Sequence, residues 1–262
     1  MPLLTAAAVS FVMLQTAGER IAAQEQARLE ACLAKIETDP DDAYEDGLAW
    51  TYQGNRPGAR QCTAMALIAL GHQAEGAERL KNLANSTDGG TLEQRAAYLS
   101  QAGNAWIEAD DPDSALKAFD GALKIAPDAP ELLLDRASAH MLLENYDEAI
   151  DDLDAVLLRV PGHGEAYQMR GAAWLAKGEP DKAMLDVNAA MEADPEDINT
   201  LVLRGQVREA LRLQADAGGP PLGGVGLVAG AYVGHLREGL PVGEALERAD
   251  KTFIDGLGCH QT

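Results

Sequence analysis

The chain has 262 residues, and its 42 acidic and 21 basic side chains give a formal net charge of −21. Because phosphate binding needs clustered Lys and Arg, this charge argues against a nucleic-acid partner and against docking on anionic membranes. Aromatic residues make up only 5% of the chain, whereas Ala and Leu are abundant, so helices are favoured over sheets. The length allows one large domain or two small ones, with a real hydrophobic core.

Residues 1–23 have the composition of a signal peptide. The segment from Pro2 to Leu14 is uncharged and mostly apolar, and it is too short to span a bilayer. Small residues follow, but no basic residue precedes the apolar run. We expect a periplasmic or secreted protein. The alternative is a cytoplasmic protein in which this segment forms a buried first helix.

The three cysteines are Cys32, Cys62 and Cys259. In an exported protein, Cys32 and Cys62 are natural disulfide partners, because each falls in a candidate helix of the same type. In a reducing cytosol they would instead be small buried apolar residues. Cys259 is left over, and the spacing of the three fits no zinc pattern.

Residues 24–95 are predicted to form divergent helical repeats. Counting back from the clear repeats that begin at Ala96 makes 57–70 the first helix of a pair, helix A. Residues 42–52 are then the second helix, helix B, of the preceding pair, and Cys32 lies on the helix A before that. A disulfide would therefore join two consecutive A helices.

Residues 96–197 contain three copies of a 34-residue unit: 96–129, 130–163 and 164–197. The columns that carry this period are proline (Pro127, Pro161, Pro195), alanine (Ala115, Ala149, Ala183), small residues (Gly103, Ala137, Gly171, Gly205) and large residues (Leu99, Leu133, Tyr167, Leu201). In the third copy, Gly178 ends helix A and Pro180 begins helix B. Two such helices cannot cover their own apolar faces, so each copy must stack on its neighbours.

The columns of residues 96–213 resemble the tetratricopeptide repeat, and the protein looks like the bacterial, exported type of that family. The resemblance implies an all-α fold, an α-solenoid that winds into a right-handed superhelix. It also implies a concave groove lined by the A helices.

The array ends in a capping helix over residues 198–213. Its own helix B is missing, because glycines and prolines at 218–221 interrupt the chain where that helix should form. Residues 218–262 are predicted to be a Gly-rich linker followed by a helix near 242–257. The resulting domains are 1–23, 24–95, 96–217 and 218–262.

No catalytic, cofactor-binding or metal-binding constellation occurs in the sequence, so we expect no enzyme and no cofactor. Arg136, Arg170 and Arg204 form a further column. They could hold anionic groups of a partner, or they could stitch successive repeats together. We favour stitching, with Arg170 paired to Asp152 and Arg204 to Asp186. Arg136 lacks the equivalent acid and is predicted to be unpaired.

The resemblance also assigns the groove. The helix A positions that face it correspond here to Asn104, Ile107, Leu134, Ser138, Met141, Gln168, Leu175, Val202 and Gln206. This lining is apolar and amide-rich and lacks Lys and Arg, so an acidic C-terminal tail is a poor ligand. The predicted function is a non-enzymatic scaffold that binds a peptide or helix of a partner protein.

Three alternatives remain at this point. The chain could be a regulatory subunit of an enzyme complex in which the C-terminal tail has a role. It could be a structural protein that self-associates as a homo-oligomer. Finally, the Gly-rich tail of the same chain could fill the groove.

Overall fold

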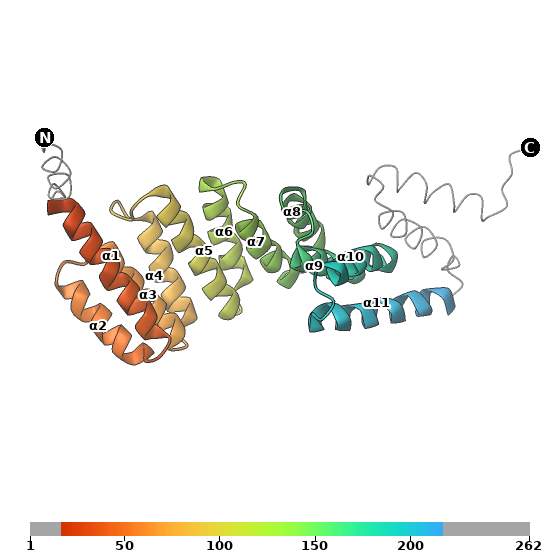
Figure 1. Cartoon of the computed structure of the whole chain (residues 1–262), viewed down its shortest axis with the longest axis horizontal. Coiled ribbons are helices and arrows are strands. Elements are labelled where there is room, and N and C mark those ends of the chain that lie inside the picture. The colour runs from red at the N-terminus through yellow and green to blue at the C-terminus, as the bar shows by residue number, and fades with distance from the viewer. Residues whose placement is uncertain (1–16, 217–262) are drawn as a thin grey trace, which may run out of the picture. The chain divides into compact units, whose positions relative to one another are not determined.

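The computed structural model describes residues 17–216, and every regular element among them is an α-helix (Figure 1). The segments predicted as a signal peptide and as the C-terminal tail lie mostly outside the described residues, since α1 begins only at Ala17. The described residues fall into two compact units, which meet in the sequence between Leu143 and Glu144.

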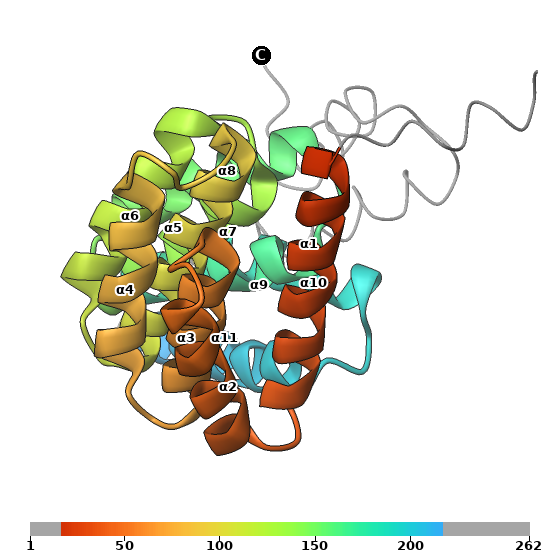
Figure 2. The ribbon, with the colours of Figure 1, turned by 90° about the vertical axis from the view of Figure 1, so that its left-hand side faces the viewer.

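The first unit consists of seven helices. They are α1 (Ala17–Ile36), α2 (Pro40–Tyr52), α3 (Pro57–Ala69), α4 (Gln73–Asn85), α5 (Leu92–Glu108), α6 (Pro112–Ile125) and α7 (Pro130–Leu142). Each helix packs on the next in the chain, and α1 also packs on α3 and α5 on α7 (Figure 2). This is the contact pattern of stacked helix pairs, in which every second helix is a helix A.

The second unit consists of four helices. They are α8 (Tyr146–Arg159), α9 (Gly164–Ala176), α10 (Pro180–Ala193) and α11 (Ile198–Asp216). Here α9 packs on α8, α10 and α11, and α10 packs on α11. The odd-numbered helices are therefore the A helices in both units, as the backward count from the repeats predicts.

The helix ends follow from local sequence. Proline occupies the first turn of α2, α3, α6, α7 and α10, where its missing N–H breaks no helical hydrogen bond. Thr91 and Gln94 form a capping box at the start of α5. Gly178 follows α9 with a φ of +75°, a conformation that costs glycine little. These signals place each turn where the 34-residue period requires it.

The core of the first unit is small residues packed around a few large ones. A Cβ atom on Gly103 would overlap the ring of Phe119, which is fully buried on α6. Near the N-terminus, Trp50 and Ala43 of α2 pack with Cys32 and Cys62. The two cysteines form a disulfide between α1 and α3, with their Cα atoms 6.0 Å apart. The covalent link therefore joins two consecutive A helices.

The second unit has a smaller apolar core, formed by Ala183 and Val187 of α10 with Leu203 and Val207 of α11. Trp174 packs against this core and is only partly buried. Lys182 and Lys177 lie over its ring, with their Nζ atoms 4.3 and 5.5 Å from the ring centre. Such cation–π contacts leave the aromatic ring packed and the charges in water.

None of the helices between residues 17 and 216 is both long and apolar enough to cross a lipid bilayer.

Candidate functional site

The predicted groove residues lie on neighbouring A helices within each unit. In the first unit, α5 carries Asn104 and Ile107, and α7 carries Leu134, Ser138 and Met141. These two helices are in contact. Asn104 is exposed and the other four are half-buried. The first unit therefore presents a mixed apolar and polar surface along its A helices.

Part of that surface is already hydrogen-bonded within the chain. Asp135 of α7 accepts hydrogen bonds from Ser100 at 3.2 Å and from Asn104 at 3.3 Å. The Ser138 hydroxyl donates to the backbone oxygen of Leu134 at 3.1 Å. The sequence offered no signal for Asp135, because it belongs to no column of the repeat. A ligand that bonds to Asn104 has to share that amide with Asp135.

In the second unit, Gln168 and Leu175 of α9 lie on the helix next to Val202 and Gln206 of α11. Gln168 and Leu175 are half-buried, whereas Val202 and Gln206 are exposed. Val202 has 56% of its surface accessible and is therefore open to a binding partner. It is the most open apolar side chain among the predicted groove residues of this unit.

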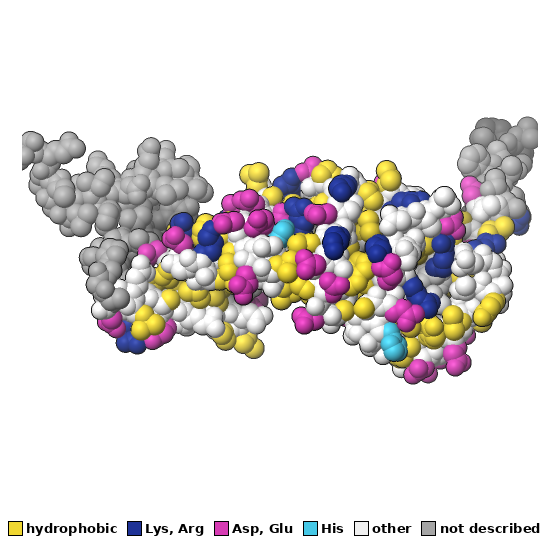
Figure 3. Space-filling view, turned by 180° about the vertical axis from the view of Figure 1, so that it is seen from behind, with side chains coloured by type: hydrophobic (Ala, Val, Ile, Leu, Met, Phe, Trp, Pro, Cys, Tyr) yellow, Lys and Arg dark blue, Asp and Glu magenta, His cyan; other side chains and the backbone are white. Residues whose placement is uncertain are grey.

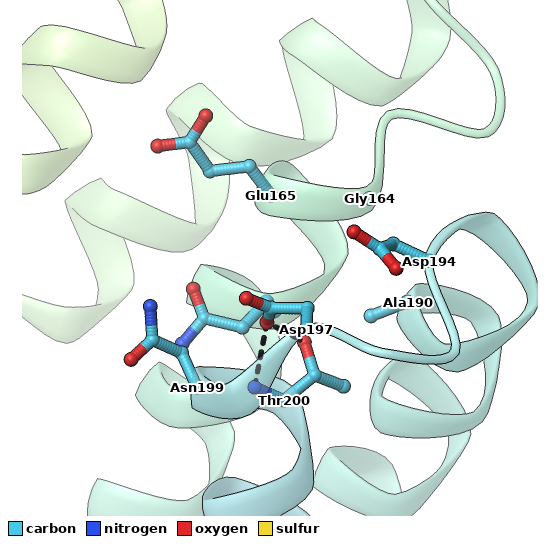
Figure 4. A pocket seen from close by; sticks show the side chains of 8 residues that line it. Gly164, Glu165, Ala190, Asp194, Asp197, Asn199 and Thr200 are labelled. Atoms are coloured by element: carbon cyan, nitrogen blue, oxygen red, sulfur yellow. Dashed lines mark hydrogen bonds between the residues drawn. The ribbon is translucent and has the colours of Figure 1, made fainter.

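A pocket of about 300 Å³ opens beside these residues (Figure 4). Its lining comes from the first turns of α9 and α11 and from the end of α10, and consists of Gly164, Glu165, Gln168, Ala190, Asp194, Asp197, Asn199 and Thr200. Three residues of this set, Glu165, Gln168 and Asn199, occupy helix A positions that the resemblance turns toward the groove. The two aspartates lie in the turn before α11 and were missed by the sequence analysis.

Asp197 is fixed by the start of α11. Its carboxylate accepts hydrogen bonds from the backbone N–H of Thr200 at 2.7 Å and from the Thr200 hydroxyl at 2.6 Å. These bonds hold the pKa of Asp197 below its usual value, so this carboxylate is ionised at neutral pH. An Asp three residues before a Thr at a helix start is an N-cap signal that the sequence did contain.

The pocket carries negative charge. Glu165, Asp194 and Asp197 contribute three carboxylates, and no Lys or Arg lines it. On the face of the molecule in Figure 3, Lys and Arg side chains lie among Asp and Glu side chains. The pocket is suited to amide, hydroxyl or cationic groups, and it repels carboxylates and phosphates.

The arginine column pairs differently from the prediction. Arg170 of α9 donates to Asp186 of α10 at 2.6 and 2.9 Å and also pairs with Asp154 of α8. Arg136 pairs with Asp120 at 2.8 Å, so its prediction as an unpaired guanidinium is wrong.

The predicted Arg170–Asp152 and Arg204–Asp186 pairs are also wrong. Arg170 pairs with Asp154 instead of Asp152, and it also pairs with Asp186, the predicted partner of Arg204. Ion pairs between consecutive helices do occur. Each is formed with the acid that lies 16 residues before the arginine, as in Arg136–Asp120 and Arg170–Asp154. Asp152 and Asp154 point to different sides of α8, since successive helical residues are about 100° apart.

Within residues 17–216, no three His, Cys, Asp or Glu side chains come together in a way that could hold a metal ion.

Comparison with known proteins supports this architecture. The family model of the tetratricopeptide repeat matches residues 102–172. The solved structure "Crystal structure of MamA protein" covers 66% of this chain and 92% of its own, with a TM-score of 0.54 and 18% identity. The fold is an α-solenoid of tetratricopeptide repeats. At that identity the likeness concerns the fold alone.

Two curated relatives match part of the chain. The "FK506-binding protein-like" protein of Rattus norvegicus is 29% identical over 151 residues, which cover 50% of this chain and 44% of the relative. The "Small glutamine-rich tetratricopeptide repeat-containing protein 2" of Mycosarcoma maydis is 30% identical over 101 residues, or 38% of this chain and 29% of the relative. The chain thus spans less than half the length of these relatives. Both are eukaryotic proteins, so they lend no support to the bacterial, exported type.

Proposed function

We propose that this protein is a non-enzymatic interaction module that binds a peptide or a helix of a partner protein along its A helices. The observation that carries the proposal is the A-helix surface of the second unit. There the exposed Val202 lies on α11, whose first turn also borders a polar pocket of about 300 Å³. An apolar anchor next to a few hydrogen-bonding groups is the usual composition of a peptide-binding surface.

The charge of this surface narrows the class of ligand. The pocket contributes Glu165, Asp194 and Asp197, and the predicted groove residues include no Lys or Arg. A peptide that ends in several carboxylates would therefore be repelled. We propose a ligand segment with apolar side chains and with neutral or basic polar groups.

The test is selection of peptides from a displayed random library against the full chain, followed by affinity measurement. Val202→Glu is expected to weaken binding of the selected peptides about tenfold or more, because it places a charge where an apolar anchor docks. Leu185→Glu is the matched control, since Leu185 is a similarly exposed apolar residue (47%) on helix B of the same unit.

The proposal fails if no peptide is selected above background. It also fails if Leu185→Glu weakens binding as much as Val202→Glu does.

Export from the cytoplasm is a second proposal, supported by the Cys32–Cys62 disulfide, because such bonds persist in oxidising compartments. Alkylation of the protein taken directly from its native source tests this. A bridged pair leaves the thiol of Cys259 as the reactive one, whereas three reactive thiols would indicate a reducing compartment.

A further inference from the structure

The last described helix has one covered face and one uncovered face. Leu203 and Val207 of α11 are buried against the neighbouring helices. The opposite side, here termed the outer face, consists of Leu201, Arg204, Gly205 and Arg208, which are three or four residues apart and therefore on one side of the helix.

In the first clear repeat, the equivalent positions are covered by that repeat's own helix B. Leu99, the counterpart of Leu201, is 8% exposed, and one of its methyl groups lies 3.2 Å from where a Cβ on Gly121 of α6 would be. Gly103, the counterpart of Gly205, lies directly against Phe119 of α6. Leu99 and Gly103 thus form the seam between the two helices of the pair.

On α11 the same seam is open. Leu201 is 37% exposed, and a Cβ on Gly205 would meet no described atom within 4 Å. A glycine inside a helix costs roughly 0.5–1 kcal/mol relative to alanine, and here no described neighbour needs the space that it provides. The outer face has the shape of a helix B docking site without a helix B among residues 17–216.

The outer face also carries charge that is not compensated within the described residues. Neither Arg204 nor Arg208 forms an ion pair with any residue of 17–216, whereas Arg170, at the same repeat position as Arg204, pairs with two aspartates. Arg204 and Arg208 lie about one helical turn apart and make this face locally basic in a chain of net charge −21. They favour an acidic occupant.

The chain itself contains a segment that fits. Ala249, Phe253 and Gly256 are separated by four and three residues, as are Ala115, Phe119 and Ala122 of α6. Residues 242–257 also contain four acidic and two basic side chains, namely Glu244, Glu247, Asp250 and Asp255 with Arg248 and Lys251.

We propose that residues 242–257 are the displaced helix B of the last repeat and dock on the outer face of α11, with Phe253 over Gly205. In an antiparallel arrangement with this register, Asp250 lies level with Arg208, and Glu247 lies one helical turn further toward the end of α11. The occupant is therefore part of the same chain, and it covers the side of α11 that faces away from the groove.

The connection is long enough for this return. The 25 residues from 217 to 241 (241 − 217 + 1 = 25) include many glycines. Gly-rich chains of 25 residues in general span roughly 25–30 Å (root mean square), which is comparable to the length of α11 at ~1.5 Å per residue. Tethering also keeps the segment at an effective concentration of the order of millimolar.

Cysteine crosslinking in the full chain tests the placement. Asp255 lies two residues after Phe253, as Gly121 lies two residues after Phe119, so the Leu99–Gly121 contact predicts that Leu201 faces Asp255. Leu201→Cys with Asp255→Cys, in a Cys259→Ser background, should therefore form an intramolecular disulfide in a glutathione buffer. Val202→Cys with Asp255→Cys is the matched control, because Val202 is the next residue of α11 and belongs to the groove. Peptide mass mapping should show crosslinking at least about tenfold faster for the Leu201 pair.

Equal rates would overturn the proposal. Faster crosslinking from Val202 would mean that the tail fills the groove, and crosslinks between molecules would mean that a second copy covers the outer face. Either result also overturns it.

Hydrogen exchange provides an independent measurement without introduced cysteines. Phe253→Asp should speed exchange of the α11 amides about tenfold in the full chain, because the charged side chain removes the cover of the outer face. Ile254→Asp, the neighbouring substitution outside the Ala249–Phe253–Gly256 pattern, should have a much smaller effect. Identical exchange in the two variants would contradict docking through Phe253.

Discussion

The two units share one repeat template and the same arginine–aspartate link between a helix B and the next helix A, but they fill the seam within a helix pair differently. In the first unit, a disulfide joins α1 to α3 and an aromatic ring fills the space over Gly103. In the second unit, Arg170 of α9 ties α8 and α10 through two aspartates. The repeat therefore fixes where neighbouring helices meet. The seam within a pair can be filled by an aromatic ring or by an ion pair, and a disulfide can join consecutive A helices in addition.

The difference follows from the size of one side chain. Phe119 of α6 corresponds to Val187 of α10 (187 − 119 = 68, two periods), and valine leaves more space at the seam. A Cβ on Gly171 would be 3.4 Å from Asp186 rather than in overlap with a ring. Asp186 uses that space, with only 6% of its side chain exposed, and Arg170 compensates its charge.

Removal of the ion pair is the largest expected effect. Arg170→Met leaves the Asp186 carboxylate buried without its partner, and we expect the second unit to lose roughly 3–5 kcal/mol of stability. Native-state hydrogen exchange of the α9 and α10 amides measures this. Arg212→Met is the control, since Arg212 pairs with Glu209 on the exposed surface of α11, and such pairs contribute little to stability because water screens the charges. Equal losses of stability in the two variants would show that the ion pairs of Arg170 do not stabilise the second unit.

Loss of the disulfide is expected to come next. Cys32→Ser with Cys62→Ser should destabilise the first unit by roughly 2–4 kcal/mol, because the unfolded chain regains the freedom that the crosslink removed. The α9–α10 amides of the second unit serve as the internal control and should exchange at unchanged rates. A uniform change in both units would contradict a local effect of the crosslink.

A glycine comparison should give a smaller effect. Gly103→Ala forces a methyl group into the Phe119 ring and should cost roughly 1–3 kcal/mol. Gly171→Ala, at the same repeat position, meets ordinary van der Waals contacts and should gain up to about 1 kcal/mol from helix propensity. Denaturant titration of each variant measures the two shifts. The same sign for both would refute the explanation from side-chain size.

The smallest effect is a pH dependence. Burial raises the pKa of Asp186, while the Arg170 guanidinium opposes that rise. In Arg170→Met only burial remains, so the folded-state pKa of Asp186 lies further above its unfolded value of about 3.9. A raised folded pKa means that protonation favours the folded state.

The stability deficit of Arg170→Met should therefore be full at pH 7 and shrink as the pH falls toward about 4. Exchange measured across that range checks the trend. Arg170→Met with Asp186→Asn has no carboxyl group to titrate at this position, so its deficit should stay flat. A deficit that grows in acid would reverse the assigned sign.

The pattern of alternate A and B helices was predictable because it depends on spacing alone. The columns of small, large and proline residues repeat at 34 residues, and counting back from Ala96 assigned α2 and α3 correctly despite the divergent sequence. The pocket in the second unit was predictable only in part. Gln168 followed from the repeat, but Asp194 and Asp197 belong to a turn whose path depends on how α10 and α11 pack.

The sequence by itself determined the period, the helix boundaries and which helix faces meet, because these depend on side-chain volume at fixed intervals. Only the tertiary structure decided which acid pairs with which arginine. It also decided that Asn104 of the predicted groove is hydrogen-bonded to Asp135. The physical reason is direction. Asp152 and Asp154 have the same side chain, yet residues two apart on a helix point about 200° apart, so only Asp154 faces Arg170.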